Sequence, residues 1–155
     1  MMKQIIENVK QTIAQKEILW AHPIALELQK YHYSLAIQWA IECIQIYSSE
    51  MKSDKLSKLN KYIQQAMDEQ NVLTPLQCDE ISRKIWYLPE REEIQTAIAR
   101  LWGSIAAFRD GEEQGGIIET TRTVELVLPD ISDRRLLDRY LEAAVRICEE
   151  EKSQN

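Results

Sequence analysis

The sequence predicts an all-α fold, a single-domain helical bundle of about seven or eight helices. Ile, Leu, Ala, Gln, Glu and Lys are plentiful, while Gly and Pro number four each in 155 residues, which favours helix over a turn-rich β architecture. Apolar residues recur at spacings of three and four along most of the chain. A chain of this length can bury roughly 70% of its unfolded surface without metal or disulfide support. We therefore expect one domain over residues 1–150, followed by a frayed polar tail at 151–155.

The first third of the chain predicts three helices. Ile5, Ile6 and Val9 place one apolar side on a helix over residues 3–19, and Pro23 opens a short second helix that ends near the "YHY" at 31–33. The third predicted helix, 34–50, is apolar on most of its sides. A helix of that composition is expected at the centre of a bundle.

The middle of the chain predicts three more helices. Ser53 or Asp54 caps a fourth, amphipathic helix, and Thr74 followed by Pro75 is a specific signal for the start of a fifth. Pro89 then opens a sixth, over about 90–109. The apolar positions expected to face inward on these helices are Leu56, Leu59, Ile63, Ala66 and Met67 on the fourth, Leu76, Ile81, Ile85 and Leu88 on the fifth, and Ile94, Ala97, Ile98, Leu101, Trp102, Ile105 and Phe108 on the sixth.

The passage "IIETTRTVELVL" at 117–128 leaves helix and strand open, because β-branched residues are common in it. Its apolar spacing fits a helix, and the chain offers no second strand for it to pair with, so helix is preferred. Pro129 interrupts the pattern. Asp130 or Ser132 then caps a last helix that runs to about residue 150.

All four glycines lie in "WGSIAAFRDGEEQGG" at 102–116. A phosphate-binding loop would need a nearby Lys or Arg and few carboxylates, whereas this stretch carries three acidic side chains in its middle. Ala99, Gly103 and Ala107 stand four apart and predict a helix-packing strip of small residues. Gly111 is expected to end the sixth helix, and the pair at 115–116 to form the turn into the next one.

Charge and cysteine content exclude several classes of function. The formal net charge is −6, so the field of the whole molecule repels phosphate backbones and nucleic acid is not an expected partner. Cys43, Cys78 and Cys148 are widely spaced on apolar helical patterns, which predicts buried free thiols in a reducing compartment. No apolar run reaches the length of a signal peptide or of a membrane span, so we expect a cytoplasmic protein without a membrane partner.

Few residues suggest catalysis, and no cofactor is implied. His22 and His32 lie at helix boundaries without a second ligand at metal-binding spacing, and no GxSxG surrounds Ser104. Cys78, near the start of the fifth helix, is the most plausible candidate for a reactive thiol, but its acidic neighbours Asp79 and Glu80 oppose formation of a thiolate. The sequence therefore leans against an enzyme.

The remaining enzymatic alternative is a metal-dependent small-molecule or nucleotide hydrolase. Helical nucleotide pyrophosphohydrolases hold magnesium with an ExxE motif on one helix and an ExxD motif on the next. Glu90 and Glu93 have the first spacing, and no later helix supplies the second. Acidic residues in the first turn of a helix are also favoured by the helix dipole alone.

The tryptophans are expected in the core, with one exception. In "IWYLP" at 85–89, Trp86 and Tyr87 are consecutive and cannot both face inward with Ile85 and Leu88. An exposed aromatic residue near the end of a helix is a candidate contact for a protein partner. Trp86 and Tyr87 are therefore the candidate partner-binding residues.

Two segments resemble a group of small, all-helical bacterial proteins, some of them encoded near secretion or immunity genes. These segments are "LAIQWAIECI", with Trp39, Ala40 and Cys43, and "AIARLWGSIAAFRDG", with the block from 102 to 108. The likeness covers about a third of the chain and departs after Gly111, where those proteins have a Ser- and Pro-rich loop. It attaches no activity to any residue.

Taken with the composition, the resemblance implies a non-catalytic interaction module of adaptor or immunity type. The acidic balance suits a basic protein partner. Assembly with further copies of the same chain stays open.

Overall fold

The computed structural model describes residues 1–14, 20–51, 54–89 and 92–154, which form eight helices and no strand. The prediction of an all-α helical bundle is confirmed. The helices are α1 (Met2–Ala14), α2 (His22–Tyr31), α3 (Tyr33–Glu50), α4 (Lys55–Glu69), α5 (Pro75–Trp86), α6 (Glu93–Arg109), α7 (Glu113–Leu126) and α8 (Arg134–Ser153). The end predicted for the first helix, at 15–19, and the start predicted for the sixth, at 90–91, lie outside the described residues.

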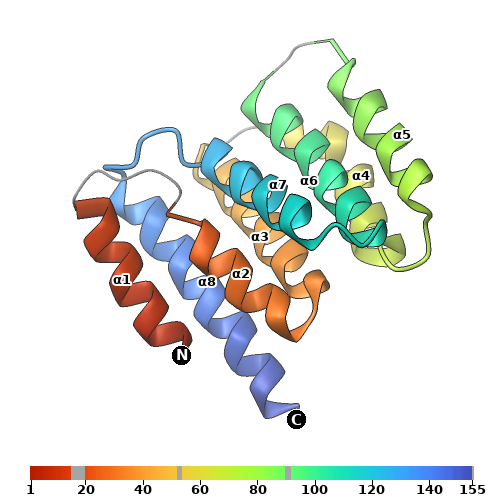
Figure 1. The fold of residues 1–155 in the computed structure, drawn as a ribbon. Coiled ribbons are helices and arrows are strands. Elements are labelled where there is room, and N and C mark those ends of the chain that lie inside the picture. The colour runs from red at the N-terminus through yellow and green to blue at the C-terminus, as the bar shows by residue number, and fades with distance from the viewer. Residues whose placement is uncertain (15–19, 52–53, 90–91, 155) are drawn as a thin grey trace.

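Helix α3 lies at the centre of the bundle, as its apolar composition predicts. It packs against α2, α4, α6, α7 and α8. On one side of it α1, α2 and α8 lie together, and on the other side α4, α5, α6 and α7 form a second group (Figure 1). Helix α5 packs against α6 alone, so it stands at the edge of the molecule.

Buried tryptophans join helices that are far apart in the sequence. The indole Nε1 of Trp39 on α3 donates to the carbonyl of Tyr140 on α8 at 2.8 Å, and Nε1 of Trp102 on α6 donates to the carbonyl of Tyr62 on α4 at 3.2 Å. The hydroxyl of Tyr140 in turn donates to the carbonyl of Val127 at 2.5 Å. These side chains bring large apolar area into the core and also satisfy their own polar atoms there.

The helix starts follow the capping signals unevenly. Thr74 caps α5 with a complete capping box, since its Oγ1 accepts from the Gln77 backbone N–H and the Gln77 side chain accepts from the Thr74 N–H. Asp54 stands at the start of α4 but makes no side-chain cap bond, and Ser53 lies outside the described residues.

The predicted cap of the last helix was wrong. Asp133, rather than Asp130 or Ser132, accepts from the Leu136 N–H at 3.1 Å. Asp130 instead accepts from the N–H and the hydroxyl of Ser132. Its carboxylate therefore stabilises a local turn that precedes the helix and does not cap the helix.

The passage at 117–128 is helical as far as Leu126, and the role predicted for the glycine pair at 115–116 was wrong. Helix α7 begins at Glu113, so Gly115 and Gly116 lie within its first turn and do not form a turn before it. A Cβ added at Gly116 would lie 2.5 Å from the ring of Phe108. The glycine therefore permits α7 to lie directly on α6.

Gly111 ends α6 as predicted, with φ of 81°. Its N–H bonds to the Phe108 carbonyl at 3.1 Å, and the Glu112 N–H bonds to the Ala107 carbonyl at 2.9 Å. These two bonds form a Schellman motif, which requires a left-handed residue at the position that glycine occupies.

Three further predictions differ from the structure. Met67 and Leu76 are 53% and 64% exposed, because the buried stripe of α4 is narrower than predicted and the inward positions of α5 start only at Cys78. Helix α8 continues to Ser153, so residues 151–153 are helical where a frayed tail was expected.

Candidate functional site

Trp86 and Tyr87 lie at the end of α5 and are exposed to 40% and 74% of their surfaces. The adjacent Ile85 is fully buried. Consecutive side chains of a helix point about 100° apart, so the two aromatic residues that follow Ile85 point away from the core. The guanidinium of Arg100 on α6 lies over the indole of Trp86, 5.8 Å from the ring centroid. This contact holds the ring beside α6 while leaving part of it accessible.

Gln95 fixes the segment that carries the aromatic pair. Its side-chain Nε2 is buried and donates to the Ile85 carbonyl at 3.0 Å and to the Leu88 carbonyl at 2.8 Å. Carbonyls at the end of a helix have no partner within the helix, so a side chain from α6 supplies one. The aromatic pair therefore stands on a backbone that is bonded to the neighbouring helix.

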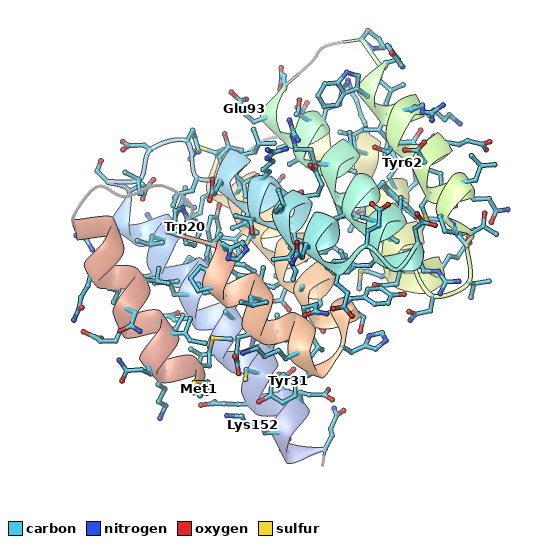
Figure 2. All side chains as sticks on the ribbon, in the orientation of Figure 1. Met1, Trp20, Tyr31, Tyr62, Glu93 and Lys152 are labelled. Carbon is cyan, nitrogen blue, oxygen red and sulfur yellow. The ribbon has the colours of Figure 1, made fainter. Side chains whose placement is uncertain are left out.

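A pocket of about 340 Å³ lies beside this segment. Its walls come from the first turns of α4, from the stretch between α5 and α6, and from the start of α6. The lining residues are Lys58, Leu59, Lys61, Tyr62, Leu88, Pro89, Glu92, Ile94 and Gln95. Figure 2 shows Tyr62 in the region where α4, α5 and α6 come together.

A second hollow, of about 320 Å³, has walls from α4, from α5 and from the stretch between these two helices. It is lined by Gln65, Leu73, Gln77, Glu80, Ile81 and Lys84. In the described part of the chain, no Cα atom of α4 comes within 8 Å of a Cα atom of α5, although both helices pack on α6. Residues of α4 line both hollows, the first together with the stretch before α6 and the second together with α5, and we call the surface that holds the two hollows the α4–α5 groove.

The charges that line the groove differ from those of the whole chain. Three lysines, Lys58, Lys61 and Lys84, line it against two glutamates, Glu80 and Glu92, in a chain of net charge −6. Among the described residues, none of these lysines has a carboxylate oxygen within 4 Å. The Lys61 ammonium lies 5.0 Å from the centroid of the Tyr62 ring. The groove therefore presents ammonium groups whose charge is available to a ligand.

A further concave region lies between α3 and α8, and both of its arginines are already paired. Its lining includes Glu42, Gln45, Arg139 and Arg146. Arg146 pairs with Glu42, and Arg139 pairs with Glu50 at 2.6 Å. These pairs join α3 to α8, which is a structural role.

Of the two carboxylates predicted as a weak metal site, only that of Glu93 belongs to the described residues. Glu93 is the first residue of α6 and is exposed, and Figure 2 shows it at the outer end of that helix. Glu90 lies outside the described residues, so the ExxE pair stays a prediction. Among the described residues, no group of three or more His, Cys, Asp or Glu side chains has the geometry to hold a metal ion.

The nucleophile candidates are shielded from solvent. Cys43, Cys78 and Cys148 are free and buried. Burial raises the pKa of the Cys43 thiol well above its ordinary value and also raises the pKa of Cys78, against a lowering by Arg109. Both shifts favour the unreactive thiol form. His32 has a structural role at the start of α3, where its Nδ1 accepts from the Ser34 N–H at 3.1 Å.

The small residues of α6 lie at contacts with two helices. The hydroxyl of Ser82 on α5 donates to the Ala99 carbonyl at 2.6 Å, and a Cβ added at Gly103 would lie 3.8 Å from the same hydroxyl oxygen, an ordinary contact. On the other neighbour, a Cβ added at Gly115 of α7 would lie 3.8 Å from the Cβ of Ala107. The tightest approach in this region is instead at Gly116.

The residues of the groove were missed by the sequence interpretation. Lys58, Tyr62 and Gln65 follow helical spacing on one face of α4, and this periodicity is visible in the sequence. The opposing face of α5 shows the same spacing. The sequence does not show that both faces line the same hollow, because this depends on tertiary packing. No described helix is long and apolar enough to cross a membrane. Comparisons with protein-family models, with curated proteins and with solved structures find no match to this chain.

Proposed function

We propose that this chain is a non-catalytic protein-interaction module of adaptor or immunity type, which binds its partner through Trp86, Tyr87 and the adjoining α4–α5 groove. The observation that carries the proposal is the exposure of two neighbouring aromatic side chains on a backbone that Gln95 bonds to α6. Rigid, partly exposed aromatic residues are typical of the anchors that dominate binding energy at protein interfaces, and the residues that follow the pair, Leu88 and Pro89, line the first hollow.

The chemistry of the described residues supports binding over catalysis. The three thiols are buried, and burial raises the pKa of Cys43 and of Cys78. The groove holds lysine, glutamate, glutamine and apolar side chains, with no nucleophile and base placed within hydrogen-bond reach among the described residues. Three free cysteines also fit a reducing compartment, and we place the protein in the cytoplasm as part of this proposal.

The test is capture of the protein from cells that produce it, comparing the wild type with W86A/Y87A. Loss of two interface anchors is expected to weaken the complex by about 30-fold or more, at roughly 2 kcal/mol for a single anchor. The matched control is I118A/I131A, which removes two apolar side chains of 43% and 36% exposure at other positions.

Thermal denaturation of each variant establishes that the fold is kept. Recovery of a stoichiometric protein partner with the wild type and the control, but not with W86A/Y87A, is the expected result. The proposal is wrong if the wild type recovers no such partner, or if the control loses it to the same extent.

A further inference from the structure

We infer that the occupant of the α4–α5 groove is an acidic amphipathic helix of a partner protein. This inference rests on the proposed function and adds to it the secondary structure and the charge of the segment that docks. The aromatic pair identifies where a partner touches the molecule, whereas the groove determines what kind of segment can lie there.

The shape of the groove fits a helix that inserts two side chains. The hollows have similar volumes, about 340 and 320 Å³, and each is large enough for one or two apolar side chains but not for a helix backbone. Lys58 lines the first hollow and Gln65 lines the second, and seven residues of α4 rise by about 10.5 Å. Side chains at positions i and i+7 of a docked helix have the same separation.

The floor of the groove fits apolar anchors. Leu73 and Ile81 are half-buried in the second hollow, and Leu88 is half-buried in the first. Each of these side chains therefore has remaining apolar surface that a docked side chain can cover, at about 25 cal/mol for each Å² removed from water.

Charge complementarity selects carboxylates for the sides of that helix. The ammonium groups of Lys58, Lys61 and Lys84 border the groove without a carboxylate partner among the described residues. The net charge of −6 suggests a basic partner for the molecule as a whole, but screening limits such an interaction to about 8 Å at physiological salt. Contacts within the groove are therefore governed by the lysines. Glu80 repels carboxylates in the second hollow and restricts the register of the helix.

The first experiment identifies the occupant in the cells that produce the protein. A photo-crosslinking residue, p-benzoylphenylalanine, replaces Glu80, which is exposed and lines the groove while leaving all three lysines in place. The same residue at Ile118 of α7 is the control. Mass spectrometry of the position 80 adduct is expected to show a segment of another protein with apolar residues at helical spacing and an excess of Asp and Glu.

Several outcomes of this experiment overturn the inference. These are a crosslinked segment that is basic or lacks helical periodicity, a second copy of this chain, a nucleic acid, a lipid, no adduct at all, or the same adduct at position 118. Capture of a protein without identification of the crosslinked segment does not support the inference.

The second experiment separates this inference from the proposed function. The variant K58E/K61E/K84E is expected to bind the identified partner at least about tenfold more weakly than the wild type, and added salt is expected to strengthen its binding where it weakens that of the wild type. If the lysine variant binds as the wild type does while W86A/Y87A does not bind, the acidic helix is wrong and the proposed function stands. If both variants bind as the wild type does, both are wrong.

Discussion

At the scale of single residues, the two glycines at the start of α7 have different roles. A Cβ at Gly116 would lie 2.5–2.7 Å from three ring atoms of Phe108, closer than van der Waals contact allows. The Phe108 ring cannot easily move, because it is nearly buried and stacks on Tyr33 with the ring centroids 5.2 Å apart. A Cβ at Gly115 would meet its nearest atoms at 3.7–3.8 Å, which is ordinary contact.

We therefore expect opposite effects from two alanine substitutions one residue apart. G116A should lower the free energy of unfolding by about 1–3 kcal/mol, because the added methyl group forces Phe108 out of its packing. G115A should leave the stability unchanged or raise it by up to about 1 kcal/mol, because alanine favours helix. Urea denaturation of both variants measures the difference. Equal effects of the two substitutions would show that Gly116 is not a close-packing position.

Residue identity predicted some of these roles and not others. Gly111 was recognisable as a helix end from the polar residues around it, because the requirement for a left-handed residue is local. The role of Gly116 was not recognisable, because it depends on how closely a second helix lies. The candidate site divides in the same way. That one of Trp86 and Tyr87 is exposed followed from their being consecutive, whereas the exposure of both and the lysine-bordered groove required the positions of the helices.

At the scale of elements, the caps distinguish helix starts that the sequence makes look alike. Thr74 and Asp54 are both favourable N-cap residues, yet only Thr74 accepts a hydrogen bond from its helix. The capping box explains the difference, because the Gln77 side-chain oxygen accepts from the Thr74 N–H at 2.9 Å and so fixes the geometry of the helix start. At the equivalent position of α4, Ser57 donates its hydroxyl to the Asp54 carbonyl at 2.5 Å, a bond that does not involve the Asp54 N–H and so forms no capping box.

Substitution of these two caps tests the contrast. T74A should lower the free energy of unfolding by about 0.5–2 kcal/mol, because it leaves the Gln77 N–H without its acceptor. D54A should change it by less, since only the weak interaction of the carboxylate with the helix dipole is lost. Thermal or chemical denaturation measures both values. A loss at Asp54 as large as the loss at Thr74 would contradict the assignment of the caps.

The segment 117–128 shows that the choice between helix and strand depends on more than the intrinsic helix propensity of its residues. Its threonines disfavour helix in isolation, but within α7 the hydroxyls of Thr120, Thr121 and Thr123 each donate to a carbonyl four residues earlier, at 2.8 Å. Ser104 on α6 adds a bond to the Gly116 carbonyl at 2.9 Å. The three threonine hydroxyls are thus satisfied inside the helical interface, so their burial carries no penalty for unpaired groups, whereas one buried carboxylate oxygen of Glu125 has no hydrogen-bond partner among the described residues.

At the scale of the whole molecule, the cysteines lie at different depths in the bundle. Cys43 is on α3, which five other helices contact, whereas Cys148 is on α8 near the end of the chain. Both side chains are at most 1% exposed, so neither reacts with a thiol reagent until some part of the structure opens. In the described part of the chain α8 packs against three helices, α1, α2 and α3, so it opens at lower free energy than α3, because fewer contacts must be broken. The rates of thiol modification therefore measure how cooperative the bundle is.

We expect Cys148 to be alkylated faster than Cys43 under native conditions, and both thiols to be alkylated at the same rate in denaturant. Peptide-level mass spectrometry after timed exposure to iodoacetamide gives the two rates separately. Most of the rise in the pKa of Cys43 is lost once the thiol is exposed, because burial is its largest cause and the charge of Glu42 is the smaller one. Labelling in mild urea should bring the two rates together, as global unfolding replaces local opening. Equal native rates would mean that α8 separates from α3 only when the whole bundle unfolds, so that the Trp39–Tyr140 hydrogen bond and the Arg146–Glu42 pair join the two helices into one cooperative unit.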